Sequence, residues 1–238
     1  MFKHETQVIK FLLQWYSMNA RKLPWRKKNN LNLPHPYFVF VSEYMLQQTT
    51  VNTVKNKFND FILKWPSLNK LAQTSEPNIL KFWSGLGYYS RARNLLKSAK
   101  IIKNNFKNNI PQTYDELIQL PGIGDYTAKA ILGIGYNKSV MPLDANIERI
   151  LVRLHAIDKP INKVKNKLKD LGKKFISDKY SSNLIQSFMD YGSEICLPRN
   201  PKCNICGINK FCQSYKKNLQ QKIPLKLKKK TTKPIKYT

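Results

Sequence analysis

The sequence predicts an all-α protein, because apolar residues recur at helical spacing along most of the chain and the alternation expected of strands is scarce. Two stripes show this spacing most clearly, one formed by Val8, Phe11, Leu12, Trp15 and Tyr16 and the other by Ile147, Ile150, Leu151 and Leu154. With 42% hydrophobic and 11% aromatic residues, the 238-residue chain can bury the core of one large or two small domains.

Helices are expected around both stripes and in further segments that Pro and Gly separate. These segments cover residues 38–54, 76–83, 91–104, 114–120, 126–134, 161–176 and 183–195. We expect two helical lobes, a central one from residues 25–137 and a second from residues 1–24 plus 138–221. Residues 222–238 contain seven Lys and two Pro with little that can pack, which predicts a basic linker or tail.

The chain carries 42 Lys and Arg against 14 Asp and Glu, a net charge of +28. Such an excess is typical of proteins held on nucleic acid by counterion release, although composition bias towards Lys and Asn is an alternative source. Residues 1–21 form an amphipathic pattern and lack the features of an export signal. No apolar stretch approaches the roughly 18 residues of a membrane span, so we expect a soluble, cytoplasmic protein without a membrane partner.

The four cysteines of the chain, Cys196, Cys203, Cys206 and Cys212, follow the pattern Cys-x6-Cys-x2-Cys-x5-Cys. Thiolates this close in sequence predict a metal centre, and both Zn²⁺ and an iron–sulfur cluster prefer sulfur ligands. Structural zinc sites usually contain two short Cys-x2-4-Cys units, whereas this chain has one, so the spacing favours iron. A pair of disulfides is the alternative, but a chain of this length does not need them to form a core.

The segment Leu120-Pro-Gly-Ile-Gly124 joins two expected helices. Its glycines let backbone N–H groups point outward at the start of the second helix, where a DNA phosphate would fit. On its own such a turn is as often a simple helix connection. With Thr127, Ala128, Ala130 and Ile131 after it, the segment resembles the helix-hairpin-helix of DNA repair glycosylases.

Three further segments extend this resemblance: Val41-Ser-Glu-Tyr-Met-Leu-Gln-Gln-Thr49, Gly85-Leu-Gly-Tyr-Tyr-Ser-Arg-Ala-Arg-Asn94 and Pro142-Leu-Asp-Ala-Asn146. With the cysteine spacing, they resemble the MutY-type adenine DNA glycosylases of the endonuclease III superfamily. The resemblance implies a [4Fe-4S] cluster on the four cysteines and a monomer that acts on double-stranded DNA in the bacterial nucleoid. The implied activity is base excision repair, by hydrolysis of the N-glycosidic bond of adenine mispaired with 8-oxoguanine or guanine.

Two acidic residues lie in these segments. Asp144 precedes an apolar-periodic helix, where its ordinary role is the N-cap, and the resemblance implies that it also stabilises positive charge on the sugar as the base departs. Glu43 falls on an otherwise apolar helix face, unless it is merely a partly exposed helix residue. The resemblance implies that Glu43 protonates the extruded adenine, and burial should raise its pKa as that role requires. Tyr126 and Asn146 are implied to order the site around both carboxylates.

Tyr126 stands where bifunctional members of the superfamily carry a nucleophilic Lys. We therefore expect a monofunctional glycosylase, with Lys129 as a surface or phosphate-contacting residue. The resemblance implies that Gln48 and Tyr88 fill the gap left by the extruded base. Further implied DNA contacts come from the hairpin and the matching segments, namely Leu46, Thr49, Gly122, Gly124, Arg26 and Arg91.

Two differences from the family pattern bear on function. Ala145 replaces a Gly that is common in the family, and Ile223-Pro-Leu-Lys226 resembles a linker that in longer members precedes a Nudix-like domain, which we expect to be absent here. That domain helps longer members to recognise 8-oxoguanine. Two rival functions stay open, a thymine or uracil mismatch glycosylase on the same scaffold and a non-catalytic DNA-binding protein.

Overall fold

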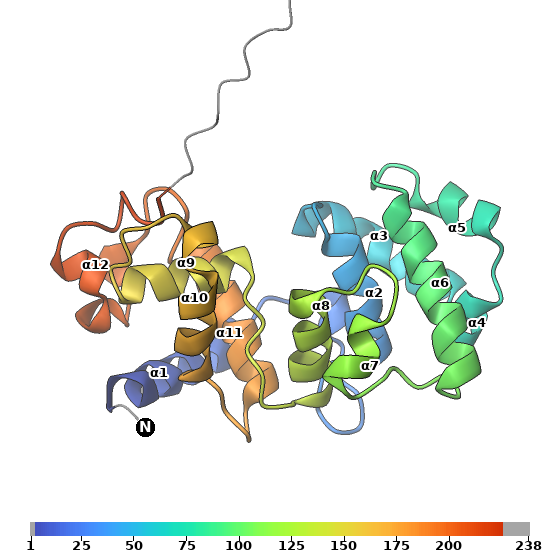
Figure 1. The fold of residues 1–238 in the computed structure, drawn as a ribbon, viewed down its shortest axis with the longest axis horizontal. Helices are drawn as coiled ribbons and strands as arrows, with labels where there is room; N and C mark the ends of the chain where they lie inside the picture. Colours follow the sequence, from blue (N-terminus) through green and yellow to red (C-terminus); the bar gives the residue numbers. More distant parts are fainter. Residues whose placement is uncertain (1–2, 226–238) are drawn as a thin grey trace, which may run out of the picture.

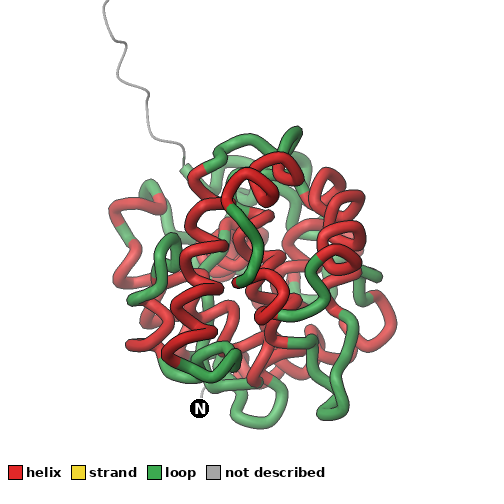
Figure 2. The backbone as a smooth tube through the Cα atoms, turned by 90° about the vertical axis from the view of Figure 1, so that its right-hand side faces the viewer, coloured by secondary structure: helices red, strands yellow, loops and turns green. Residues whose placement is uncertain are grey.

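The computed structural model describes residues 3–225, so most of the expected tail, residues 226–238, lies outside the described range. Within residues 3–225 the backbone consists of helices joined by loops, without strands (Figure 2). The β-type pairing in that range is one isolated bridge between Lys28 and Pro34. The all-α prediction is confirmed. None of the helices in the described range is long and apolar enough to cross a membrane.

A first group of helices, on the right of Figure 1, is built around α2. α2 contacts α3, α6 and α8, and it begins after His35, whose side chain accepts the Tyr37 N–H. Buried side chains run along its whole length, so α2 is the centre of this group's core. The group comprises α2 (Pro36–Leu46), α3 (Val51–Lys64), α4 (Leu68–Ala72), α5 (Glu76–Trp83), α6 (Ser90–Asn105), α7 (Tyr114–Ile118) and α8 (Asp125–Ala130).

The single helix expected over residues 38–54 is wrong, because the structure divides this segment into α2 and α3. Gln48, between them, has a φ of 55°, in the left-handed region that cannot continue a right-handed helix. α3 then starts with its own N-cap, since the Thr50 side chain accepts the Thr53 N–H. The break leaves a short loop, residues 47–50, at the end of the most buried helix of this group.

A second group, on the left of Figure 1, joins the N-terminal helix to the C-terminal part of the chain. α1 packs along α11, α11 packs on α9, and the Trp15 ring meets the Tyr191 ring edge-on at 5.0 Å between centroids. The helix expected over residues 161–176 is a 3-10 turn, η3 (Ile161–Lys163), followed by a shorter helix. The group comprises α1 (Lys3–Asn19), α9 (Ala145–Leu154), α10 (Lys165–Lys173), α11 (Ser181–Glu194) and α12 (Gln213–Lys216).

The two groups meet where a π-helical segment, η2 (Ile131–Gly135), continues from α8 and packs against α11. A Cβ on Gly133 would lie only 2.2 Å from the Ile185 side chain, so the close approach of these helices depends on glycine. These groups correspond broadly to the expected lobes, but whether they are separate domains stays a prediction.

A buried ion-pair cluster on Asp190 of α11 also connects the groups. Asp190 has no exposed surface and accepts hydrogen bonds from two arginines in the segment that leads into the first group. Arg21 Nε lies 2.6 Å from Asp190 Oδ1, and Arg26 donates twice, at 2.6 and 2.8 Å. The bidentate pair engages the Arg26 guanidinium with Asp190, and a DNA contact from Arg26 stays a prediction.

Candidate active site

A cavity of about 490 Å³ lies between the two groups of helices, and both contribute to its walls. Glu43 of α2 and Tyr126 of α8 come from the first group, and Asp144 and Asn146 from the second. All four predicted catalytic residues therefore line one cavity, although they are spread over about a hundred residues of sequence.

Glu43 is nearly fully buried, with 6% of its surface exposed. Most residues around it on α2 are apolar and buried, so the carboxyl has lost most of its hydration. This burial raises the pKa of Glu43 from 4.5 to about 8, while the Tyr126 hydroxyl partly offsets the rise by hydrogen bonding to the carboxyl. Glu43 therefore holds its proton at neutral pH, as the apolar helix face predicted.

Asp144 is the N-cap of α9, and that part of the prediction is confirmed. Its Oδ1 accepts the Ile147 N–H at 2.7 Å, and its Oδ2 accepts Asn146 Nδ2 at 2.8 Å. Burial raises the pKa of Asp144, and these hydrogen bonds together with the nearby Arg149 counteract the rise. Ala145 begins α9 without a positive φ, so the replacement of glycine there introduces no backbone strain.

Asn146 links Asp144 to the cysteine loop through the buried guanidinium of Arg149. Arg149 Nη2 donates to Asn146 Oδ1 at 2.8 Å and to the Gly192 carbonyl at 2.7 Å. Its Nε donates to the Cys196 carbonyl, also at 2.7 Å. These contacts fix the Asn146 amide so that its NH2 group faces Asp144.

The four cysteines are free thiols that line one small cavity of about 30 Å³. The Tyr191 hydroxyl donates to Cys206 Sγ and Arg153 Nη1 donates to Cys196 Sγ, each at 3.3 Å. Residues 3–225 contain no group of three or more His, Cys, Asp or Glu side chains placed to hold a metal ion. Four sulfur donors around one cavity, two of them with hydrogen-bond donors, are nevertheless the chemistry that suits an iron–sulfur cluster.

Two of the predicted DNA-contacting residues are exposed in loops of the first group of helices. Gln48 is exposed in the loop between α2 and α3, and Tyr88 is 60% exposed in the loop before α6. Both have left-handed φ values, 55° and 47°. Leu46 and Thr49 line the 490 Å³ cavity beside the first of these loops.

The hairpin between α7 and α8 lies close to the same loops. Gly122 has a φ of 81° and is exposed, as is Gly124, the N-cap of α8. Gln47 Nε2 donates to the Gly122 carbonyl at 3.1 Å, which ties the hairpin to the loop that carries Gln48. The structure thus groups the predicted DNA-binding residues of three segments, with two arginines as exceptions.

Arg91 is the second exception, because it is only 5% exposed. Its guanidinium donates to backbone carbonyls in both exposed loops. Arg91 thus occupies an internal bridging position, and a DNA contact from it stays a prediction.

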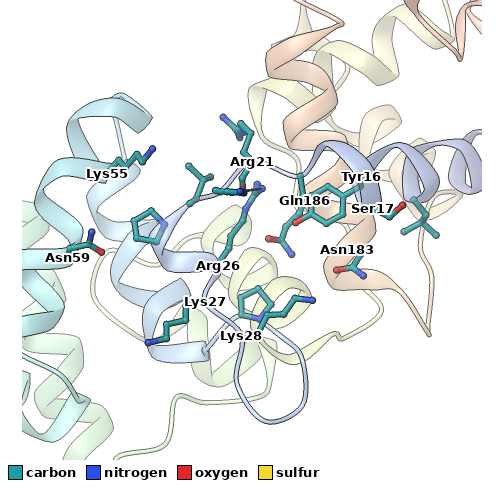
Figure 3. Close-up of a pocket in the computed structure, with 16 residues that line it drawn as sticks. Tyr16, Ser17, Arg21, Arg26, Lys27, Lys28, Lys55, Asn59, Asn183 and Gln186 are labelled. Atoms are coloured by element: carbon teal, nitrogen blue, oxygen red, sulfur yellow. Dashed lines mark hydrogen bonds between the residues drawn. The ribbon is translucent and has the colours of Figure 1, made fainter.

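A larger cavity, of about 790 Å³, adjoins the candidate site and shares Arg21, Leu23, Arg26 and Gln186 with it. Figure 3 shows Lys27, Lys28 and Lys55 around it. Neither Glu43 nor Asp144 lines this cavity, so the candidate active site is the smaller cavity.

Sequence reasoning missed three buried polar residues that line the cavities or contact residues of their walls, namely Gln186, Arg149 and Asp190. All three occupy interior positions of α9 or α11, and their partners lie elsewhere in the chain or within one turn. Periodicity alone gives no signal that such residues are buried.

Comparison with known proteins places these features in a family. Residues 41–174, which include the hairpin and both carboxylates, match the model of the HhH-GPD superfamily of base excision DNA repair proteins. The chain belongs to this superfamily. The resemblance inferred from the sequence is confirmed at that level, and the match covers the segments that carry Glu43, Tyr126 and Asp144.

Several relatives of this HhH-GPD protein are named adenine DNA glycosylase. The one from Buchnera aphidicola subsp. Schizaphis graminum is 42% identical over 92% of the chain and 62% of its own length. The one from Homo sapiens is 34% identical over 94% of the chain and 42% of its own length. The chain therefore spans about 62% of the length of the bacterial relative.

Solved structures share the fold. A thermostable thymine-DNA glycosylase superposes with a TM-score of 0.80 at 26% identity, covering 90% of this chain and 98% of that one. Endonuclease III in a non-covalent DNA complex superposes with a TM-score of 0.71 at 19% identity, covering 92% and 100%. The likeness to endonuclease III confirms the fold of the HhH-GPD chain.

Proposed function

We propose that the protein is an adenine DNA glycosylase of base excision repair. The observation that carries the proposal is one cavity lined both by the buried Glu43, whose pKa burial raises to about 8, and by the hydrogen-bonded Asp144. Relatives named adenine DNA glycosylase, 34–44% identical to the chain, support the same substrate class.

The two carboxyl groups divide the work of breaking an N-glycosidic bond. Glu43 gives its proton to the adenine ring, which turns the base into a neutral leaving group. The Asp144 carboxylate stabilises the positive charge that grows on the deoxyribose as the bond lengthens. Water then adds to the sugar carbon and its proton passes to the Glu43 carboxylate, so the acid is restored and free adenine and an abasic site result.

Tyr126 and Asn146 orient these groups. The Tyr126 hydroxyl hydrogen-bonds the Glu43 carboxyl, and Asn146 donates to Asp144 while Arg149 holds its amide in place. A carboxylate fixed by several donors pays little reorganisation when charge develops nearby, which is the basis of electrostatic preorganisation.

The enzyme is monofunctional in this proposal. Lysine is missing from the described residues that line the cavity, and a phenol at position 126 cannot form a Schiff base. Lys129 lies one turn further along α8, where its ammonium pairs with Asp125 at 2.8 Å. Hydrolysis without strand cleavage follows.

Double-stranded DNA is the proposed partner of the monomer. The net charge of +28 supplies the electrostatic attraction, and the exposed glycines of the hairpin present backbone N–H groups to phosphate. Gln48 and Tyr88 would fill the space left in the duplex by the extruded adenine. The proposed mispairs are adenine opposite 8-oxoguanine and adenine opposite guanine.

A [4Fe-4S] cluster is the proposed cofactor, held by Cys196, Cys203, Cys206 and Cys212. It would tie the cysteine loop together and so fix the Cys196 carbonyl, which accepts from Arg149. In this role it is structural, and the steps at the sugar and the base rely on protein side chains and water.

A thymine glycosylase acting on mismatches is the second candidate, because the chain superposes on a thymine-DNA glycosylase with a TM-score of 0.80 at 26% identity. A non-catalytic DNA-binding protein is the third, although it leaves the raised pKa of Glu43 without a use.

The deciding experiment is base release under single-turnover conditions from duplexes that carry A opposite 8-oxoguanine, A opposite G, A opposite T, and T opposite G. Half of each reaction is treated with alkali, which breaks the strand at abasic sites. An Asp144→Asn protein purified in parallel controls for contaminating glycosylases.

Alkali-dependent breakage at the mispaired adenines supports the proposal. Breakage at the T opposite G would favour the thymine activity, and breakage without alkali would contradict the monofunctional assignment. Binding of the duplexes without any base release would leave a DNA-binding protein.

A further inference from the structure

Arg91, the second residue of α6, bridges two loops from a buried position. Its Nη1 donates to carbonyls at the end of α2 and in the turn after it, and its Nη2 donates to the loop before α6. The accepting oxygens belong to Tyr44, Met45, Gln47, Leu86 and Gly87. One guanidinium therefore joins two segments that are far apart in sequence.

The two loops are held at equivalent points. In each, Arg91 binds the carbonyl of the residue just before a left-handed, non-glycine residue: Gln47 before Gln48, and Gly87 before Tyr88. Left-handed φ is unfavourable for a residue with a Cβ and persists only where its surroundings enforce it. By fixing the peptide unit that enters each of these residues, the guanidinium supplies that enforcement.

Gln48 and Tyr88 are also the side chains that these loops expose. Tyr88 is 60% exposed, and the Arg91 guanidinium lies 5.6 Å from the centroid of its ring. The second loop has one further tie, since Trp83 Nε1 donates to the Gly87 carbonyl at 3.1 Å. Strained backbone that presents an exposed aromatic ring is a feature that occurs at functional sites.

Arginine suits this position for geometric reasons. Among the described residues no carboxylate forms an ion pair with Arg91, and its Nε has no hydrogen-bond partner, so only the two terminal nitrogens are engaged. Those two nitrogens diverge in a rigid plane, one towards each loop. A lysine would keep the charge, but its single ammonium cannot hold both loops in the same way.

We propose that Arg91 is a positioning residue that locks Gln48 and Tyr88 in place for base extrusion, and that it does not act in cleavage of the glycosidic bond. This inference rests on the proposed glycosylase function, because extrusion matters only to an enzyme that acts on a base. A plain C-terminal cap of α2 would need no bonds to the second loop, whereas Arg91 binds two carbonyls there.

The test compares Arg91→Lys with Arg93→Lys, a matched control two residues along α6 whose side chain is 46% exposed. Single-turnover release is measured from adenine opposite guanine and from adenine opposite a stable abasic analogue, where no pair must be broken. In parallel, 2-aminopurine beside the target adenine reports extrusion by its fluorescence. Both variants are studied at a temperature at which circular dichroism shows them folded.

We expect Arg91→Lys to slow release from the paired substrate about tenfold more than from the unpaired one, with a smaller fluorescence rise and an unshifted pH–rate profile. Arg93→Lys should match the parent protein on all three readouts. Equal slowing on both substrates, or no slowing, would overturn the proposal. If the parent releases no adenine from any duplex, the glycosylase function fails, and the fluorescence change alone then decides on Arg91.

A mutant cycle shows whether Arg91 acts by positioning Gln48 and Tyr88 or by stabilising the fold in general. In a Gln48→Gly, Tyr88→Gly background the two side chains are gone and glycine accepts the left-handed backbone without strain. Arg91→Lys should then change the rate less than about twofold, because nothing is left to position. The same loss as in the parent would mean that Arg91 acts through the fold alone.

Discussion

The two walls of the candidate site carry the same functional group in different surroundings. Glu43 lies in the middle of a buried, largely apolar helix and is hydrogen-bonded by Tyr126, whereas Asp144 caps a helix and accepts from Ile147 and Asn146. Burial raises the pKa of both carboxyls; one hydrogen bond opposes it at Glu43, and three hydrogen bonds and Arg149 oppose it at Asp144. One carboxyl therefore keeps a proton to donate and the other is prepared to carry charge, which is the division that glycosidic bond cleavage requires.

The largest expected effect comes from removing the acid. Glu43→Gln keeps the shape of the side chain but has no acidic proton, so single-turnover adenine release should fall by about 10²- to 10⁴-fold with duplex binding retained. Glu76→Gln, an exposed glutamate of α5, is the matched control and should leave the rate unchanged. If Glu43→Gln released adenine at nearly the rate of the parent protein, Glu43 would not be the general acid.

A somewhat smaller loss is expected at the opposite wall. Asp144→Asn retains an oxygen that caps α9, so the fold should persist, but the negative charge beside the sugar disappears. Adenine release should fall by about 10²- to 10³-fold in the same assay. Asp158→Asn, at an exposed loop position, serves as the control. Unfolding of Asp144→Asn without loss of rate per folded molecule would show that Asp144 is a cap and nothing more.

The two walls also differ in how far sequence alone predicts them. An N-cap is a local device, so Asp144 before an apolar-periodic helix was predictable, as was the raised pKa of a glutamate among apolar neighbours. The break after α2 was not, because Gln48 carries none of the usual helix-breaking signals and its conformation is enforced from α6. Likewise, the Asp190 contacts with Arg21 and Arg26 join residues more than 160 positions apart.

The difference in surroundings should also appear in stability. Folding lifts the pKa of Glu43 from 4.5 to about 8, so between these values the folded protein binds a proton that the unfolded chain has released. Stability from this group is therefore lost as pH rises through that window. Glu43→Gln does not titrate, so its melting temperature relative to the parent should increase by several degrees from pH 5 to pH 8.5. A pH-independent difference in thermal unfolding scans would contradict the raised pKa.

The smallest expected effect comes from removing the Tyr126 hydroxyl, which hydrogen-bonds the Glu43 carboxyl. Hydrogen bonding from Tyr126 favours the charged form of Glu43 and so lowers its pKa from the value that burial alone would give. Tyr126→Phe should therefore move the basic limb of the pH–rate profile upwards, because Glu43 keeps its proton to higher pH. At pH 7 the rate should fall only about three- to tenfold, the loss expected for one hydrogen bond that orients the carboxyl. A limb that stays in place or moves down would mean that Tyr126 does not act through Glu43, and the contrast between the two walls would then rest on burial alone.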